Sequence, residues 1–232
     1  MMSARIDGIL PVAGKKTVVV QVGEASFEVA ASVAAELALE PGLEVTAGLR
    51  ACLEAAAGRR LAAAEALRFL RGRPRTAREV RGRLLERGHA LEVVEAVLAE
   101  LDQSGIVNDA RYAEWFVAAR LAHRPTGPAR LVHEMCLRGV PRPMAETAVG
   151  RILGESREED LALAAARSRL VAVRRLGRER GLRRLASFLA GRGFGDATVR
   201  RVCLRLFAAE VPAPDSRLAR GPSRLPPQPE EP

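Results

Sequence analysis

Arginine is the residue type with the most prominent chemistry in this chain. Eight arginines fall within 18 residues, where Asp and Glu are scarce. They are Arg167, Arg169, Arg174, Arg175, Arg178, Arg180, Arg183 and Arg184. Helical spacing would place 167, 174 and 178 near one side of one helix, and 180, 183 and 184 on one face of the next. Guanidinium groups bind phosphate oxygens through contacts that weaken as salt rises, so a basic patch for a polyanionic partner is predicted. The alternative is a solvated surface in an arginine-biased protein.

No set of residues has the spacing of a catalytic or cofactor site. His133-Glu134 lacks the second histidine of the zinc-protease motif. The glycine-rich run 191–195 lacks the Lys-Ser/Thr ending of a phosphate loop and lies between two helical patterns. The adjacent carboxylates of residues 158–160 are better explained as favourable charge at a helix N-terminus than as Mg²⁺ ligands. We therefore expect no catalytic residue, no metal, no cofactor and no enzymatic activity.

Cysteine usage and hydropathy bear on where the protein works. Cys52, Cys136 and Cys203 are odd in number and far apart, which favours small core residues of a reduced protein. No apolar run reaches the ~18 to 20 residues needed to span a bilayer, and residues 1–9 lack the pattern of an export signal. We expect a cytoplasmic protein without a membrane segment.

The main aromatic cluster has two interpretations. Tyr112, Trp115 and Phe116 follow i, i+3, i+4 spacing, which is the usual signature of a buried helix face. Exposed aromatic side chains beside arginines can instead stack on the bases of a single nucleic-acid strand. The core interpretation is favoured, and the stacking interpretation stays open.

Three segments end a helical apolar pattern with the same Arg-Gly pair. The glycines are Gly88, Gly139 and Gly193, which lie 51 and 54 residues apart. Counted from each glycine, the residues eight and four positions before it are apolar. The residues nine and ten positions after it are apolar or small. Each copy is predicted to form three helices. In the first copy, a capping box at Thr76 and Glu79 marks the start of the second helix. The fold class expected is mainly α, with three tandem three-helix repeats in a curved array.

The order of these elements defines a domain plan. A small β-rich module with short helices is predicted over residues 1–60, where short β-rich runs alternate with turns. The three-helix repeats are expected over 61–104, 105–155 and 156–210, and a disordered Pro-rich tail over 211–232. The net charge is +9, and residues 151–210 carry 14 basic and 7 acidic groups. The basic excess therefore lies in the third repeat, which favours nucleic acid as a partner.

Over roughly residues 62–207 these motifs resemble the RecX family, bacterial regulators of the RecA recombinase. The resemblance rests on matches in all three repeats, in the order that the family shows. The motif residues are Arg73, Glu79, Arg87, Gly88, Asp109, Arg111, Tyr112, Arg120, Gly127, Glu134, Gly139, Arg192 and Gly193. Asn108 stands where the family usually has an Asp, and Met135 replaces a Leu. Neither departure threatens the predicted fold.

The resemblance implies a protein without catalytic activity that binds RecA filaments on single-stranded DNA. Such a protein blocks filament extension or promotes disassembly, and so modulates recombination, DNA repair and the SOS response. The partners expected are the RecA filament and single-stranded or duplex DNA, and the protein is expected to be a monomer. The rival hypothesis is a direct DNA-binding protein that acts without RecA, its repeats working like helix-turn-helix readers. Against this rival, the second and third helices of the repeats share no pattern of Arg, Asn or Gln that would read the edges of bases.

Overall fold

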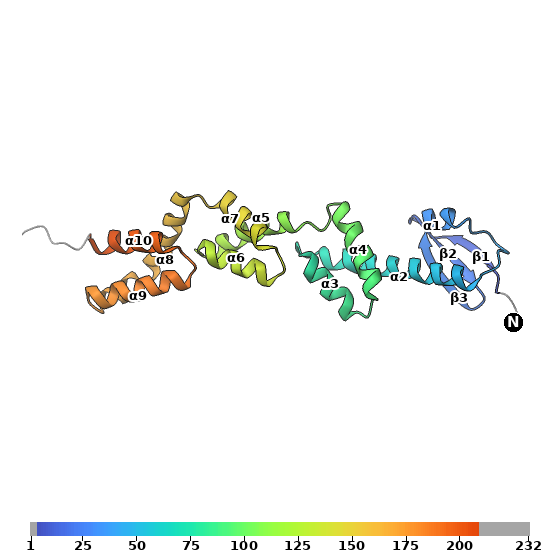
Figure 1. Ribbon diagram of the computed structural model, residues 1–232, viewed down its shortest axis with the longest axis horizontal. Helices are drawn as coiled ribbons and strands as arrows, with labels where there is room; N and C mark the ends of the chain where they lie inside the picture. The colour runs from blue at the N-terminus through green and yellow to red at the C-terminus, as the bar shows by residue number, and fades with distance from the viewer. Residues whose placement is uncertain (1–3, 209–232) are drawn as a thin grey trace, which may run out of the picture. The chain divides into compact units, whose positions relative to one another are not determined.

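The computed structural model describes residues 4–208, apart from the side chains of residues 155–156. The tail expected over 211–232 lies outside the described residues. The chain forms two compact units. The first runs up to Arg124 and includes Pro128–Gly154, and the second joins Pro125–Gly127 to the residues from Glu155 onward. Figure 1 labels the elements of both units.

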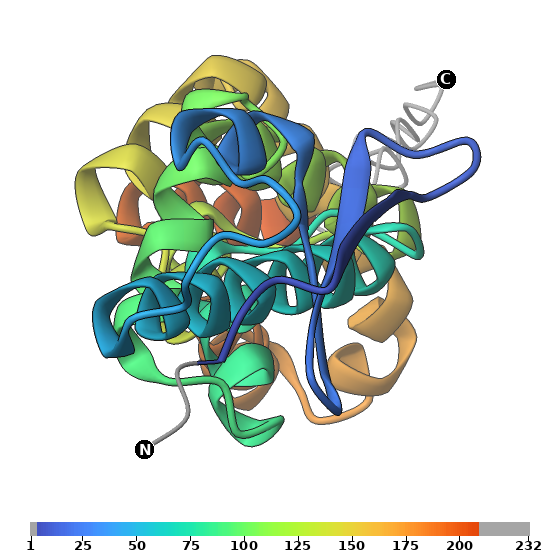
Figure 2. The same ribbon diagram turned by 90° about the vertical axis from the view of Figure 1, so that its right-hand side faces the viewer.

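The first unit begins with a small antiparallel sheet. Its strands β1 (Gly8–Pro11), β2 (Thr17–Val22) and β3 (Ala25–Ala30) pair in the order β1-β2-β3. Val22 pairs with Ala25, so a two-residue turn joins β2 to β3, and Gly23 supplies the positive φ of 59° that such a turn favours. The short helix α1 (Ala31–Glu36) follows, and α2 (Ala47–Leu70) packs against β3. Figure 2 shows the sheet in blue with the teal turns of α2 beside it.

Helix α2 is longer than the sequence indicated. It begins at Thr46, whose side chain accepts a hydrogen bond from the Leu49 amide, and it continues without a break to Leu70. The boundary that we expected between residues 60 and 61 falls inside this helix. The sheet core contains Leu53, and the core of the first repeat contains Ala62. The N-terminal module and the first repeat therefore share one helix, because an alanine-rich run contains nothing that ends it.

The first two repeats complete this unit. In the first, α3 (Ala77–Glu86) and α4 (Leu91–Gln103) pack on the second half of α2. In the second, α7 (Arg142–Ile152) packs on both α5 (Asp109–His123) and α6 (Pro128–Leu137). The described core of the second unit is formed by residues of α8 (Glu155–Arg174), α9 (Arg178–Gly191) and α10 (Asp196–Ala208), together with Phe194 between α9 and α10.

The predicted repeat frame is confirmed by burial. The residues eight positions before the three glycines are fully buried, and so are those four positions before: Val80, Leu131 and Leu185, then Leu84, Met135 and Leu189. Gly88, Gly139 and Gly193 have φ values of 84°, 93° and 84°. This left-handed conformation strains any residue with a side chain, which explains why a glycine ends each of these helices.

Two local expectations were wrong. Gly177 has a φ of 79° and precedes α9, so Arg178 starts that helix and does not share α8 with Arg174. Cys203 is buried, but Cys52 is exposed, so the cysteines do not all belong to the core. The left-handed conformation of Gly177 interrupts an otherwise continuous helical pattern, and the position of Cys52 on α2 leaves its side chain in solvent.

Candidate functional site

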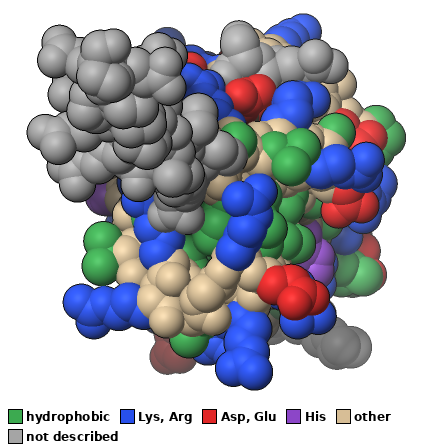
Figure 3. Space-filling view, turned by 90° about the vertical axis from the view of Figure 1, so that its left-hand side faces the viewer, with side chains coloured by type: hydrophobic (Ala, Val, Ile, Leu, Met, Phe, Trp, Pro, Cys, Tyr) green, Lys and Arg blue, Asp and Glu red, His purple; other side chains and the backbone are tan. Residues whose placement is uncertain are grey.

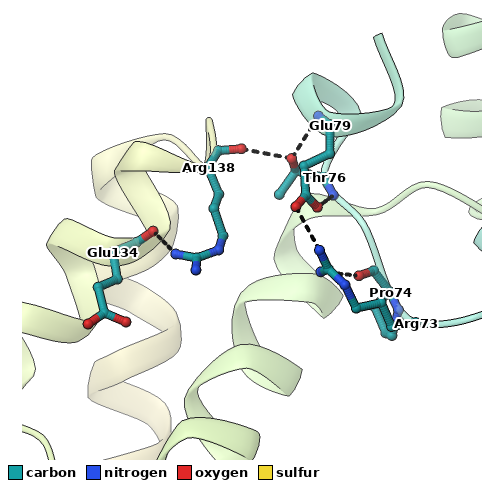
Figure 4. A network of polar contacts seen from close by, with 6 residues as sticks. All are labelled: Arg73, Pro74, Thr76, Glu79, Glu134 and Arg138. Atoms are coloured by element: carbon teal, nitrogen blue, oxygen red, sulfur yellow. Dashed lines mark hydrogen bonds and ion pairs between the residues drawn. The ribbon is translucent and has the colours of Figure 1, made fainter. Parts of the chain in front are cut away.

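A buried polar network joins the first repeat to the second (Figure 4). Thr76 is fully buried, and its hydroxyl accepts a hydrogen bond from the Glu79 amide at 3.1 Å. The same hydroxyl donates to the carbonyl oxygen of Arg138 at 2.7 Å. The Glu79 carboxylate accepts from the Thr76 amide and from the Arg73 guanidinium, at 3.2 and 3.1 Å. The capping box predicted at the start of α3 is therefore confirmed, and it also binds the end of α6.

Two neighbouring residues at the start of α5 accept hydrogen bonds from the N-termini of different helices. The Asn108 side chain accepts a hydrogen bond from the Arg111 amide at 2.9 Å and so caps α5 itself. Asp109 instead accepts from the Ala77 amide of α3, also at 2.9 Å. Burial raises the pKa of Asp109, and the Ala77 hydrogen bond opposes that rise. The sequence could not separate these roles, because either side chain can cap a helix.

The arginines of the three Arg-Gly pairs have different partners. Arg138 donates to the Glu134 carbonyl oxygen at 2.6 Å, as expected of a residue at a helix end, and lies 4.9 Å from the Phe116 ring centroid. Arg87 instead pairs with the Glu65 carboxylate of α2 at 3.0 Å. Arg192 donates to the Pro125 carbonyl oxygen at 3.2 Å. The three glycines therefore share one backbone conformation, whereas the three arginines before them contact different groups.

Glu134 lies between two arginines in the second repeat. Its side chain accepts hydrogen bonds from Arg120 at 2.7 Å and from Arg130 at 3.0 Å. Burial acts to raise the pKa of Glu134, but these two guanidinium groups outweigh it and leave the pKa below its ordinary value. The motif residues Arg120 and Glu134 therefore bind each other and hold α5 against α6.

Gly127 is one of the motif residues, and a close backbone contact within the second unit requires a glycine at this position. Its amide donates to the Arg192 carbonyl oxygen at 2.9 Å. A Cβ atom at residue 127 would lie 2.2 Å from the Gly193 carbonyl carbon and oxygen. Only glycine permits this approach of the two backbone segments. Gly139 is restricted similarly, because its Cβ would lie 2.6 Å from atoms of the Arg78 side chain.

All eight arginines of the predicted patch are exposed, but they do not share one face. Arg169 lies over the Phe188 ring, with its guanidinium carbon 5.5 Å from the centroid. Arg169, Phe188 and Arg184 line a hollow of about 740 Å³ between α8 and α9. Arg183 pairs with Glu179 and lines a different hollow, and Arg174 donates to the Leu206 carbonyl oxygen. Figure 3 shows Lys and Arg side chains distributed around exposed hydrophobic groups at this end of the chain.

The adjacent carboxylates at 158–160 have structural partners. Glu158 accepts a hydrogen bond from the Gly195 amide at 3.0 Å, and Glu159 pairs with Arg201 and Arg205 at 3.1 and 3.6 Å. Within residues 4–208, no group of three His, Cys, Asp or Glu residues is arranged to hold a metal ion. No helix in the same range is long and apolar enough to cross a membrane.

The aromatic cluster is divided between core and surface. Tyr112 and Phe116 are buried, as the favoured interpretation predicted, but Trp115 is 38% exposed. The motif residue Arg111 is exposed one turn before Trp115. Sequence reasoning missed Arg71 and Arg75, which lie near this tryptophan in the link between α2 and α3. The alternation of arginine with Gly and Pro over 71–75 was the available signal.

Tandem three-helix repeats that follow a small sheet define a helical-repeat protein. Residues 62–101 match the family model of the first three-helix domain of RecX, and residues 108–149 match that of the second. The chain belongs to the RecX family, whose members include proteins named as regulatory proteins. It is thus a member of a family of regulatory proteins.

The similarity extends over most of each relative. The regulatory protein RecX of Streptomyces lividans is 36% identical over 138 residues, which is 59% of this chain and 72% of that protein. The RecX of Amycolatopsis mediterranei is 36% identical over 60% of this chain and 80% of its own length. A crystal structure of regulatory protein RecX aligns with a TM-score of 0.76 over 86% of this chain and 98% of its own. At 21% sequence identity, that likeness shows the fold.

Proposed function

We propose that this protein binds RecA filaments on single-stranded DNA and inhibits RecA. It would block filament extension or promote disassembly, and so modulate recombination and DNA repair. The observation that carries the proposal is membership of the RecX family, supported by relatives named regulatory proteins. The exposed arginines of the second unit supply positive charge suited to the DNA of a filament or to acidic protein surfaces.

The proposed contact is spread over several exposed arginines rather than concentrated in one pocket. Exposed arginines of α8 and α9 would bind backbone phosphates without reading the base sequence. Contacts of this kind add through the high effective concentration of neighbouring sites, so each can be modest. The protein acts in this proposal as a cytoplasmic monomer without catalytic activity or cofactor, and its affinity falls steeply as salt rises.

The test is a titration of the protein into RecA assembled on single-stranded DNA. DNA-stimulated ATP hydrolysis and strand exchange are expected to fall at protein concentrations well below that of RecA. Full activity of RecA at saturating protein would contradict the proposal. Tight duplex binding that is the same with and without RecA would favour the direct DNA-binding hypothesis instead.

Charge reversal tests the arginine contacts. Arg169→Glu with Arg184→Glu changes the two arginines that share the α8–α9 hollow, and inhibition is expected to weaken along with its salt dependence. Arg200→Glu with Arg59→Glu is the matched control, because it makes the same change in net charge at exposed residues outside that hollow. Equal effects of the two pairs would show that net charge alone matters.

A further inference from the structure

A hollow in the first unit gathers four arginines beside the exposed tryptophan. It lies between the α2–α3 link and the start of α5, and its volume is about 550 Å³. Small-molecule sites usually have volumes of about 300 to 1,000 Å³. The residues that concern its chemistry are Arg71, Arg73, Arg75, Arg111, Tyr112 and Trp115. No Asp or Glu is among the described residues that line it.

The charge of this hollow is only partly neutralised. Arg73 pairs with Glu79 at 3.1 Å, and Arg75 lies over the Phe69 ring with its guanidinium carbon 4.2 Å from the centroid. The side chains of Arg71 and Arg111 are exposed and have no hydrogen-bond or ion-pair partner among residues 4–208. Four guanidinium groups and one paired carboxylate leave an excess of positive charge. The ligand that suits this hollow is therefore an anion.

The aromatic residues add a second recognition element. Tyr112 lines the hollow but is only 1% exposed, so its ring supports the neighbouring side chain of Trp115. Trp115 lies next to it, with ring centroids 5.8 Å apart, and part of its indole reaches solvent. Ile106 also lines the hollow and is exposed, so an apolar ring could be sheltered there.

We propose that this hollow binds single-stranded nucleic acid. Arg71 and Arg111 contact the backbone phosphate, and a base stacks on the exposed part of Trp115. Exposed aromatic residues bordered by guanidinium groups are the usual means of holding unpaired bases without sequence preference. An acidic peptide would use the arginines but would leave the indole and Ile106 without a matching group. The site is separate from the arginines of the second unit, and it rests on the proposed function only in the choice of DNA as probe.

The chain contains one tryptophan, so its fluorescence reports directly on this hollow. The full-length protein, without RecA, is titrated with oligothymidylate at low salt, and saturable quenching of the Trp115 emission is expected. Arg111→Gln is expected to weaken binding and to reduce the slope of log affinity against log salt by about 0.7, the value for one phosphate of a single strand. Arg59→Gln is the matched control, an exposed arginine of the same unit outside the hollow.

A second variant tests the stacking interaction. With a fluorescein-labelled oligothymidylate, Trp115→Ala is expected to weaken binding about five- to a hundredfold, whereas Trp115→Phe keeps most of the affinity because it keeps an aromatic face. Circular dichroism checks that both variants are folded.

Three results would overturn the proposal. They are the absence of saturable quenching, equal effects of Arg111→Gln and Arg59→Gln, and stronger quenching by polyglutamate than by oligothymidylate. The last result would identify an acidic-peptide site. RecA enters none of these measurements, so their failure is distinguishable from failure of the proposed RecA inhibition.

Discussion

Replacing Gly127 with alanine should destabilise the second unit. The added Cβ would lie 2.2 Å from the Gly193 carbonyl group, so one of the two backbone segments must move. Overpacking of this kind costs about 1–3 kcal/mol. Movement would also weaken the 2.9 Å hydrogen bond from the Gly127 amide to the Arg192 carbonyl oxygen, at a further cost of about 1 kcal/mol. Lower entropy of the unfolded chain returns about 0.4–1 kcal/mol. The net loss in the free energy of unfolding is about 2 kcal/mol.

The measurement is chemical denaturation followed by circular dichroism. Gly191→Ala is the matched control, because Gly191 lies in helix α9 of the same unit and a Cβ there meets nothing within 4 Å. That variant is expected to be at least as stable as the unmodified protein, since alanine is the better helix former and its Cβ has open space. Equal stability of Gly127→Ala and the unmodified protein would refute the argument, because the clash would then be relieved at no cost.

Three further predictions concern the polar groups of the first unit. Thr76→Ala removes both the α3 cap and the hydrogen bond to Arg138, and should cost about 2 kcal/mol in urea denaturation, whereas Thr76→Ser should retain most of the stability. Glu134→Gln should cost about 1–3 kcal/mol at neutral pH. Because the folded state lowers the pKa of Glu134, this stabilisation is present above the ordinary value of 4.5 and is lost as the pH falls through the lowered pKa. The two denaturation curves should therefore converge in acid, and a constant gap would contradict the cause assigned. Asp109→Asn should preserve or slightly raise stability at neutral pH, because burial opposes the charge of Asp109 and an amide oxygen can still accept the hydrogen bond from the Ala77 amide. A large loss of stability would show that the charge itself is needed.

The repeat frame was predictable because it depends on local rules. A glycine with positive φ ends the middle helix of each repeat, and apolar residues at helical spacing face one side, so the buried positions around these glycines could be identified in advance. The capping box at Thr76 and Glu79 was predictable for the same reason, since both residues belong to one turn of helix. The family resemblance depended on these positions too.

Contacts between elements were not predictable in this way. Asn108 and Asp109 are chemically similar neighbours, and only the approach of α3 decides that Asp109 binds the Ala77 amide. Gly127 carries no local signal of its contact, because the segment it touches lies more than sixty residues further along the chain. Helical spacing could not foresee the break at Gly177, which places Arg178 on a different helix from Arg174.

The amino-acid pattern was sufficient to establish the three-helix repeats, the glycines at which one helix of each repeat ends and the buried positions before those glycines, because these follow from short-range geometry and the period of the α-helix. Which arginines meet depended on the packing of helices against one another, since a side chain's neighbours come from distant parts of the chain. Packing exposed Trp115 while burying Tyr112 and Phe116, and it brought Arg71 and Arg111 to one hollow. The surfaces through which this protein is proposed to act were therefore set by tertiary contacts, whereas the framework that carries them could be read from the sequence.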